Sequence, residues 1–259
     1  MRVAVAGGTG VVGRHVVGLL RERGQEPVVL ARSHGVDVLT GAGLEQQLTG
    51  VEAVVDVSNV TTTSRRRSVA FFTGSTGRLL EAGRRAGVRH HVALSIVGVE
   101  RVDLGYYAGK RAQEQLVLAG PVPGSVLRAA QFHEFAGQLL DRVRGPVAVI
   151  PRMLVQPVAA REVARALVDL AAAPPVGVAP ELAGPQELEL VELARQVQHA
   201  RRSRRPVLGV RLPGRGGRAM AQGALLPTGP GPRGQQSFDQ WLADSCRSVA
   251  QGRGGRTRP

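Results

Sequence analysis

Short apolar runs alternate with longer stretches of helically spaced apolar residues up to about residue 145. Apolar runs bounded by glycine or polar residues are typical of buried strands, and the spaced stretches are typical of amphipathic helices. Strands are predicted at residues 2–6, 27–31, 53–57, 91–96 and 125–128, and helices at residues 11–20, 42–48, 68–86, 107–118 and 133–143. This alternation predicts an α/β fold, a Rossmann-type doubly wound parallel sheet with right-handed crossovers.

After about residue 145 the pattern loosens, because prolines separate short apolar segments. Further elements are expected as helices at residues 160–172 and 189–201, a strand at 206–212, and a last helix from a Ser237 cap through Ala243. Residues 213–234 are rich in glycine and proline, so they predict an irregular segment.

The composition excludes several classes of protein. A single cysteine, Cys246, excludes an internal disulfide and a cysteine-based zinc site, and no carboxylate spacing indicates another metal site. No run of 18 apolar residues predicts a transmembrane helix. Gly7, Gly8 and Gly10 interrupt the first apolar run too early for a secretory signal peptide, so a cytoplasmic protein is expected.

The net charge of +14 is concentrated in one region of the chain. Residues 195–259 hold thirteen arginines against only two aspartates. The basic cluster at residues 201–205 has no interleaved aromatic residues, so a solvated helix end is favoured over a nucleic-acid contact. The preference for arginine over lysine is also typical of a GC-rich genome. We therefore expect neither nucleic acid nor a membrane as partner.

The turn after the first predicted strand carries a glycine-rich motif, Ala-Gly-Gly-Thr-Gly-Val-Val-Gly. Glycines allow the tight turn, the approach of the backbone to a pyrophosphate, and close packing of the helix on the sheet. The following helix N-terminus offers N–H groups and a positive dipole to phosphates. The strand and helix on either side supply the context that supports the motif. The residues expected to bind a dinucleotide here are Gly7, Gly8, Thr9, Gly10, Val11, Val12 and Gly13.

The end of the second predicted strand favours NADP(H) over NAD(H). An NAD site usually offers a carboxylate there to the ribose 2′-hydroxyl, but this chain has none. Arg32 can form a fork to a 2′-phosphate and Arg14 could assist, although both could be ordinary surface arginines. Asp37 and Val38 lie where such folds often touch the adenine, and a structural Asx turn is the alternative for Asp37.

Tyr106 and Lys110 form a Tyr-x-x-x-Lys pattern, which places a phenol and an ammonium on one helix face. An adjacent ammonium favours the phenolate, so the pattern predicts a lowered Tyr106 pKa suited to proton transfer. Ser95, at the end of the fourth predicted strand, could orient a carbonyl. Lys110 is the only lysine among 34 basic residues, and a guanidinium does not readily replace an ammonium beside ribose hydroxyls. The alternative is a surface lysine paired with Glu114.

These motifs resemble the short-chain dehydrogenase/reductase superfamily, and more narrowly its atypical NmrA-like NAD(P)-binding branch, as found in actinobacteria. The resemblance extends over about residues 1–245, and the glycine turn and the Tyr-x-x-x-Lys pattern are its specific parts. It implies Tyr106 as proton donor, Lys110 on the nicotinamide ribose and Ser95 polarising the carbonyl. Spacing favours Tyr106 over Tyr107 as the residue that faces the nicotinamide.

The resemblance also assigns residues that follow other strands. Ser58 and Asn59 occupy the usual position of a loop beside the cofactor ribose. After the strand at residues 125–128, the side chains expected to line the nicotinamide and substrate side are those of Gln131, Phe132 and His133. His133 could relay protons or could equally be a structural histidine. Gly124 stands where the family has a bulky aromatic, which predicts a looser segment there.

The chain is expected to form one NAD(P)-binding domain over residues 1–245. Residues 1–145 are the expected cofactor-binding core and residues 146–245 a small substrate-side lobe. Residues 246–259 have the composition of a disordered basic tail. The chain is expected as a monomer or homodimer.

Two functions remain from the sequence. The first is an NADPH-dependent oxidoreductase that passes hydride to a carbonyl or quinone of a small-molecule substrate. The second is a non-catalytic NAD(P)-binding redox sensor or transcriptional co-regulator of the NmrA-like type. The intact set of Ser95, Tyr106 and Lys110 favours the enzyme, and the looser C-terminal half favours the sensor.

Overall fold

The computed structural model describes residues 1–254, with side chains as far as Arg247. Its centre is a six-stranded sheet in the order β2-β1-β3-β4-β5-β8, in which every pairing is parallel. The strands are β1 (Arg2–Ala6), β2 (Glu26–Leu30), β3 (Ala53–Asp56), β4 (His90–Ile96), β5 (Gly124–Ala129) and β8 (Gly177–Val178). The predicted doubly wound α/β fold is confirmed. Because the strand order reverses between β1 and β3, the ligand-binding switch point of such a sheet lies at their carboxyl ends.

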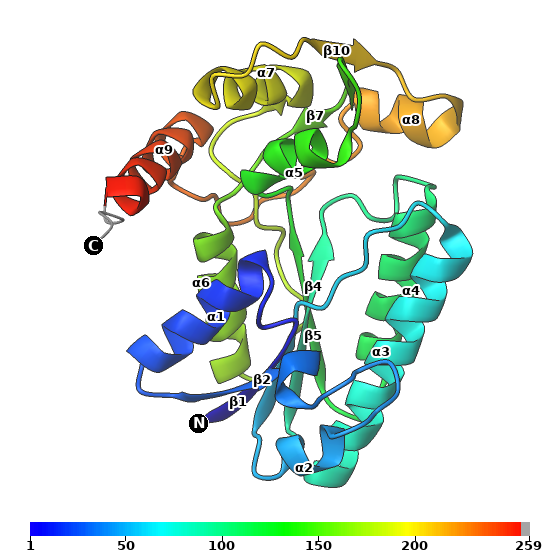
Figure 1. The fold of residues 1–259 in the computed structure, drawn as a ribbon. Coiled ribbons are helices and arrows are strands. Elements are labelled where there is room, and N and C mark those ends of the chain that lie inside the picture. The colour runs from blue at the N-terminus through cyan, green and yellow to red at the C-terminus, as the bar shows by residue number, and fades with distance from the viewer. Residues whose placement is uncertain (255–259) are drawn as a thin grey trace.

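Helices cover both faces of this sheet (Figure 1). α1 (Val11–Glu22) packs with α6 (Ala160–Ala172) on one face, and α3 (Arg65–Ala86) packs with α4 (Gly105–Ala119) on the other, where the short α2 (Leu44–Leu48) lies beside α3. The strands are apolar on both faces for this reason. In β1, Val3 and Val5 belong to the core under α1 and α6, while Ala4 and Ala6 belong to the core under α3.

The second half of the chain builds most of a lobe beyond the carboxyl ends of the strands (Figure 1). Its helices are α5 (Glu134–Arg142), α7 (Leu190–Ala200), α8 (Gly214–Ala221) and α9 (Phe238–Gly254). Its strands are β6 (Ala148–Pro151) and β10 (Val207–Val210), which pair in parallel, and β7 (Leu154–Val155) and β9 (Leu188–Glu189), which pair antiparallel. A separate apolar core, which includes Ile150, Met153 and Phe238, holds these elements together.

The lobe does not follow the predicted ranges residue by residue. α5 already packs in the lobe core, before residue 145. α6 and β8 fall within residues 146–245, yet they pack in the layers of the central sheet. The chain therefore crosses between core and lobe more than once.

α9 continues through Gly254 and so includes residues 246–254 of the predicted tail. Ser237 and Gln240 form a reciprocal cap at its start, and Arg247 pairs with Asp244 one turn earlier. The predicted cap at Ser237 is thus present, with the backbone N–H of Gln240 3.2 Å from its hydroxyl. The rest of the predicted tail, residues 255–259, lies outside the described residues.

α8 forms inside the segment that was expected to be irregular. Its glycines serve close packing: a Cβ on Gly216 would lie 2.9 Å from the Leu104 side chain, and one on Gly217 would lie 2.2 Å from the Leu212 carbonyl oxygen. A glycine-rich helix of this kind gives no strong sequence signal, because its composition is typical of a loop. Among the described residues, every helix is too short or too polar to cross a lipid bilayer.

Candidate functional site

The glycine-rich turn joins β1 to α1 at the switch point. Gly7 has a left-handed φ of 79°, and a Cβ on it would lie 2.7 Å from the Val57 carbonyl oxygen. A Cβ on Gly13 would lie 2.1 Å from the Gly7 carbonyl oxygen, so α1 packs directly on the turn. Gly10 caps α1 without a side-chain hydrogen bond, which leaves the first N–H groups of the helix open to an anion. The turn has the form that a pyrophosphate requires.

The remaining residues of the motif divide between surface and core. Thr9 is exposed beside Gly10, whereas Gly8 and Val12 are buried and Val11 is partly buried. The Val12 side chain packs in the apolar core. At these buried positions, only the backbone is suited to contact a phosphate.

Three buried polar atoms without partners lie at the ends of successive strands. The atoms are Ser58 Oγ after β3, Ser95 Oγ near the end of β4, and Gln131 Oε1 after β5. Buried polar atoms normally have hydrogen-bond partners, and a polar molecule bound along this edge would supply them. Together with the glycine turn, this set fits a dinucleotide at the carboxyl edge of the sheet.

Tyr106 lies in the first turn of α4 and faces the loop after β3. Its hydroxyl donates a hydrogen bond of 2.7 Å to Asn59 Oδ1, and its ring packs edge-on against Phe72. Burial raises the pKa of Tyr106 to about 12, against a smaller lowering by the Arg142 guanidinium. The predicted lowering of this pKa by Lys110 is therefore wrong. The phenol stays protonated and is a hydrogen-bond donor.

Tyr107 has a different environment. It packs against the apolar core of the lobe, and burial raises the pKa of its phenol as well. Its ring lies edge-on to that of Tyr106, with 5.8 Å between centroids. The structure thus gives Tyr106 the hydrogen bond to the β3 loop and gives Tyr107 a packing role.

Lys110 is buried, with only 5% of its surface exposed. Its Nζ donates to the Leu94 carbonyl oxygen and to Gln113 Oε1, both at 2.5 Å, and lies 4.6 Å from the Phe72 ring centroid. Burial lowers the pKa of Lys110 to about 8, while the negative charges of Asp56 and Glu114 act in the opposite direction. The alternative of a surface lysine is wrong.

Glu114 has a different partner. Its carboxylate makes a two-pronged ion pair with Arg128 on β5, at 3.0 and 2.7 Å. The pairing with Lys110, which belonged to the alternative of a surface lysine, is not among the ion pairs of the described residues.

Ser95, Tyr106 and Lys110 border the same edge but do not touch through hydrogen bonds anywhere in the described chain. Lys110 is bonded to the residue before Ser95, and Phe72 contacts both Lys110 and Tyr106. The three residues therefore lie where α4 starts and β4 ends, and the Phe72 ring packs against Tyr106 and Lys110.

The end of β2 has the predicted arginine and no carboxylate. Arg32 begins a short 3-10 turn, is exposed, and makes no side-chain hydrogen bond or ion pair within residues 1–247. Arg14 is exposed on α1. Asp37 Oδ1 accepts a bond of 2.8 Å from the Leu39 N–H, so the Asx turn given as its alternative is present. Val38 packs against the core under α3.

His133 packs against the start of α9. Its side chain is 1% exposed, its Nε2 lies 3.0 Å from the Gln236 carbonyl oxygen, and its ring contacts Phe238 and Trp241. These contacts at the start of α9 fit the structural histidine that was the alternative to a proton relay. Phe132 is partly buried and packs against the core of the central sheet.

The looser segment expected at Gly124 is not present. A Cβ on it would lie 2.4 Å from the Val117 carbonyl oxygen, so β5 begins in tight contact with α4. The segment is close-packed and not loosened, and it lies at the amino end of the strand, away from the switch point.

Sequence reasoning missed two buried polar residues beside Lys110. Asp56 ends an otherwise apolar strand, and Gln113 follows Lys110 by one helical turn. Gln113 Nε2 donates to Asp56 Oδ2 at 2.9 Å, and Asp56 Oδ1 accepts from the Ser58 N–H at 2.9 Å. A carboxylate in an apolar strand is a signal that could have found the first of them.

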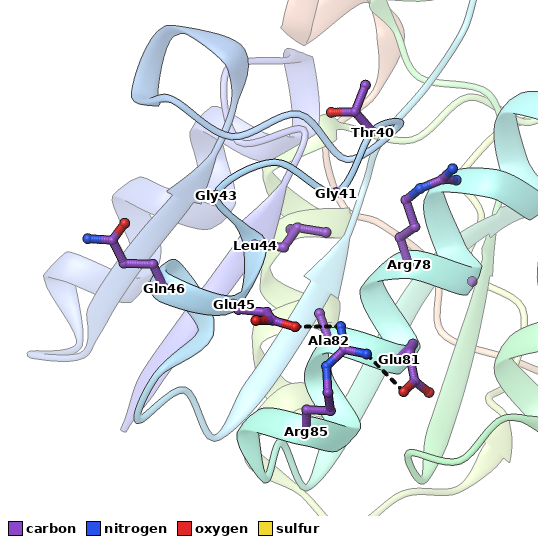
Figure 2. A pocket seen from close by; sticks show the side chains of 11 residues that line it. Thr40, Gly41, Gly43, Leu44, Glu45, Gln46, Arg78, Glu81, Ala82 and Arg85 are labelled. Atoms are coloured by element: carbon purple, nitrogen blue, oxygen red, sulfur yellow. Dashed lines mark hydrogen bonds and ion pairs between the residues drawn. The ribbon is translucent and has the colours of Figure 1, made fainter.

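A pocket of about 570 Å³ lies elsewhere, between α2 and the second half of α3 (Figure 2). Arg85 lies between Glu45 and Glu81 there, at 2.7 and 3.0 Å, so its charge is already balanced. The pocket contains none of the predicted site residues.

The basic cluster at residues 201–205 is partly engaged within the lobe. Arg201 pairs with Asp141 at 2.6 Å, and the Arg205 guanidinium donates to the Val143 carbonyl oxygen at 2.7 Å. These arginines join α7 and the following loop to α5. No group of three or more histidine, cysteine or acidic side chains within the described part of the chain could hold a metal ion.

Comparisons with known proteins place this geometry in context. No family model matches the chain. A curated protein of Streptomyces griseus subsp. griseus, (4-alkanoyl-5-oxo-2,5-dihydrofuran-3-yl)methyl phosphate reductase, is 33% identical over 144 residues, which is 50% of this chain and 48% of the relative. The chain thus matches this curated relative over about half of its length.

Solved structures share the whole fold. One is a short-chain dehydrogenase/reductase superfamily protein from Agrobacterium tumefaciens with bound NAD, at a TM-score of 0.69 and 20% identity, over 99% of this chain and 100% of the other. Another is DesIV, a dTDP-glucose 4,6-dehydratase from Streptomyces venezuelae with NAD bound, at 0.71 and 20%, over 98% of both chains. These likenesses show that the chain has the fold of NAD-binding short-chain dehydrogenases/reductases.

Proposed function

We propose that this chain is a short-chain dehydrogenase/reductase that uses NADPH to reduce a carbonyl or quinone of a small molecule. The observation that carries the proposal is the glycine turn at the switch point, with orphaned Ser58, Ser95 and Gln131 atoms along the same sheet edge. The curated relative is named a reductase, which supports the reductive direction.

The chain has residues for each part of the cofactor. The residue 7–13 turn would hold the pyrophosphate through backbone N–H groups at the start of α1. Ser58 and Asn59 would border the ribose, and Gln131 would lie toward the nicotinamide. Bound NADPH supplies the hydride.

The preference for NADPH rests on charge after β2. Arg32 has an exposed guanidinium that no described carboxylate neutralises, and Arg14 is exposed on the adjacent helix. A guanidinium binds phosphate through two parallel hydrogen bonds, which suits a 2′-phosphate. No carboxylate is present at this position to bind a 2′-hydroxyl.

Tyr106 would supply the proton. Since its pKa is raised to about 12, the phenol is protonated at neutral pH and can donate to an alkoxide forming at the substrate. In the free protein this O–H donates to Asn59 Oδ1 at 2.7 Å, so it has to turn from Asn59 to the substrate oxygen before it transfers its proton. Ser95 Oγ has no partner in the chain and can donate to the same carbonyl oxygen.

The test combines binding with turnover. The protein is titrated with NADPH and NADH. The nicotinamide absorbance is then followed in the presence of candidate substrates: ketones, quinones and an acyl-butenolide phosphate, which is the type of compound in the name of the curated relative. Tyr106→Phe should reduce turnover by about 10²- to 10⁴-fold, the usual contribution of a positioned acid, and leave NADPH affinity unchanged. Tyr107→Phe is the matched control.

A second candidate is a non-catalytic NAD(P)-binding sensor. It is favoured by the absence of hydrogen bonds among Ser95, Tyr106 and Lys110 within the described chain. Tight NADPH binding without consumption across the panel would support the sensor. Absence of binding to either nucleotide would contradict both functions.

A further inference from the structure

A chain of buried polar groups runs between the central sheet and the α3–α4 layer, ending at Lys110. Asp56 on β3 and Gln113 on α4 are 0% and 1% exposed. Gln113 Nε2 donates to Asp56 Oδ2 at 2.9 Å, and Gln113 Oε1 accepts from Lys110 Nζ at 2.5 Å. The neutral amide thus connects a buried carboxylate to a buried ammonium.

In each hydrogen bond of this chain of polar groups, a donor faces an acceptor. The Gln113 amide nitrogen faces two acceptors, Asp56 Oδ2 and Thr76 Oγ1 at 3.2 Å, while its oxygen faces the ammonium. A flipped amide would direct N–H groups at Lys110 and an oxygen at Asp56, so the two charges fix its orientation. A buried ammonium is costly unless it is hydrogen-bonded and near an opposite charge. Gln113 and the Leu94 carbonyl supply the hydrogen bonds, and Asp56 supplies a negative charge on the far side of the amide.

The same carboxylate reaches the loop after β3. Asp56 Oδ1 accepts the Ser58 N–H at 2.9 Å, so one side chain holds both the loop and, through Gln113, the lysine. At the other end, Lys110 is bonded to the Leu94 carbonyl oxygen, immediately before Ser95. The network therefore ties together two predicted parts of the cofactor site.

We propose that Gln113 and Asp56 are positioning residues for Lys110, which hold its ammonium charged and directed at the carboxyl end of β4. The contribution of Gln113 and Asp56 to the reaction rests on the proposed function, because it assumes that Lys110 binds the cofactor. The effect of both residues on the pKa of Lys110 does not rest on the proposed function.

Two other titratable groups, Glu114 and His91, lie near the network, and neither replaces Asp56 as the negative charge linked to Lys110 through Gln113. Glu114, on the same helix as Lys110, is engaged by Arg128 in a two-pronged ion pair. His91 Nε2, on β4, lies 4.0 Å from Asp56 Oδ2, and its pKa is lowered mainly by burial, so the ring is neutral at pH 7. Asp56 is therefore the counter-charge that Gln113 brings to Lys110.

The single lysine of the chain allows a direct test. Protein grown with ¹³Cε-labelled lysine gives one side-chain NMR resonance, and its pH titration in the free protein reports the pKa of Lys110, which is about 8. Asp56→Asn should lower that pKa by about 1 pH unit or more, as loss of a nearby opposite charge does, and Gln113→Met should lower it less. Ser75→Ala, buried on α3 outside the network, is the control and should leave it unchanged.

A second variant covers the case in which Asp56→Asn does not fold. Gln113→Glu puts a carboxyl group between Asp56 and Lys110. The two carboxyl groups then share a proton, and the negative charge moves next to the ammonium, which should raise the pKa of Lys110. Unchanged Lys110 pKa values in the folded Gln113→Met and Gln113→Glu proteins would overturn the inference while leaving the reductase standing. Failure of the wild-type protein to bind NADPH, with the pKa shifts as expected, would instead overturn the proposed function alone.

Discussion

The hydroxyl of Tyr106 donates to Oδ1 of Asn59 across 2.7 Å, which joins the start of α4 to the loop after β3. The same Asn59 oxygen accepts the N–H of Val60 at 2.8 Å, so the amide is fixed from both sides. The bond holds the phenol beside the β3 loop, and its single O–H must leave Asn59 before it can donate to a substrate.

We expect this bond to contribute to stability independently of any cofactor. A double-mutant cycle of Tyr106→Phe and Asn59→Ala should give a coupling energy of about 0.5–1.5 kcal/mol, the net value of a typical hydrogen bond. Urea unfolding at neutral pH measures it. Strict additivity of the two single variants would show that the side chains do not interact in solution.

Gly13→Ala should disrupt the cofactor turn, because its Cβ would lie 2.1 Å from the Gly7 carbonyl oxygen. Forcing α1 away from the turn should cost about 1–3 kcal/mol of unfolding free energy, as overpacking does, and weaken NADPH binding. Gly18→Ala is the matched control in the same helix, since nothing lies within 4 Å of a Cβ there. It should stabilise the protein by about 0.5–1 kcal/mol. Equal effects of the two variants would contradict the tight turn.

Arg32→Asp should reverse the cofactor preference. Removing the guanidinium from the end of β2 and adding a carboxylate should weaken NADPH binding by about 10- to 100-fold, the value of a charge-assisted hydrogen bond, and improve NADH binding. Calorimetric titration with both nucleotides measures the ratio. Arg215→Asp on α8 makes the same charge change at another exposed arginine. If both variants lower NADPH affinity equally, the loss comes from the change in the net charge of the protein, and Arg32 does not contact the 2′-phosphate.

The sequence predicted the parts of the fold that depend on local signals. The glycine turn and the strands around it follow from spacing, because Gly13 is required by its contact with Gly7 in the same turn, although Gly7 itself lies against Val57 just after the neighbouring strand. Helix α6 was predicted at residues 160–172 and has those bounds, since its apolar face is continuous. The Gly13 contact and the bounds of α6 need no knowledge of distant contacts.

What the sequence did not reveal depends on pairs far apart along the chain. Gln113 and Asp56 are separated by 57 residues, and His133 reaches a carbonyl 103 residues away. The raised pKa of Tyr106 likewise reflects burial, which spacing along one helix does not report. The Tyr-x-x-x-Lys pattern correctly places both residues on α4, but the side chains that surround each one come from other elements.

Lys110 should make the stability of the protein rise with pH above about 8. Burial lowers the pKa of Lys110 from 10.5 to about 8, so between these values the unfolded chain holds a proton that the folded chain has lost. The unfolding free energy therefore increases with pH in this window, with a slope that approaches about 1.4 kcal/mol per pH unit. The raised pKa of Tyr106 acts oppositely above pH 10, because the unfolded phenol ionises first. Urea unfolding at intervals from pH 7.5 to about 10 measures the slope. In Lys110→Met the rise should disappear, and the same slope in both proteins would show that another group causes it.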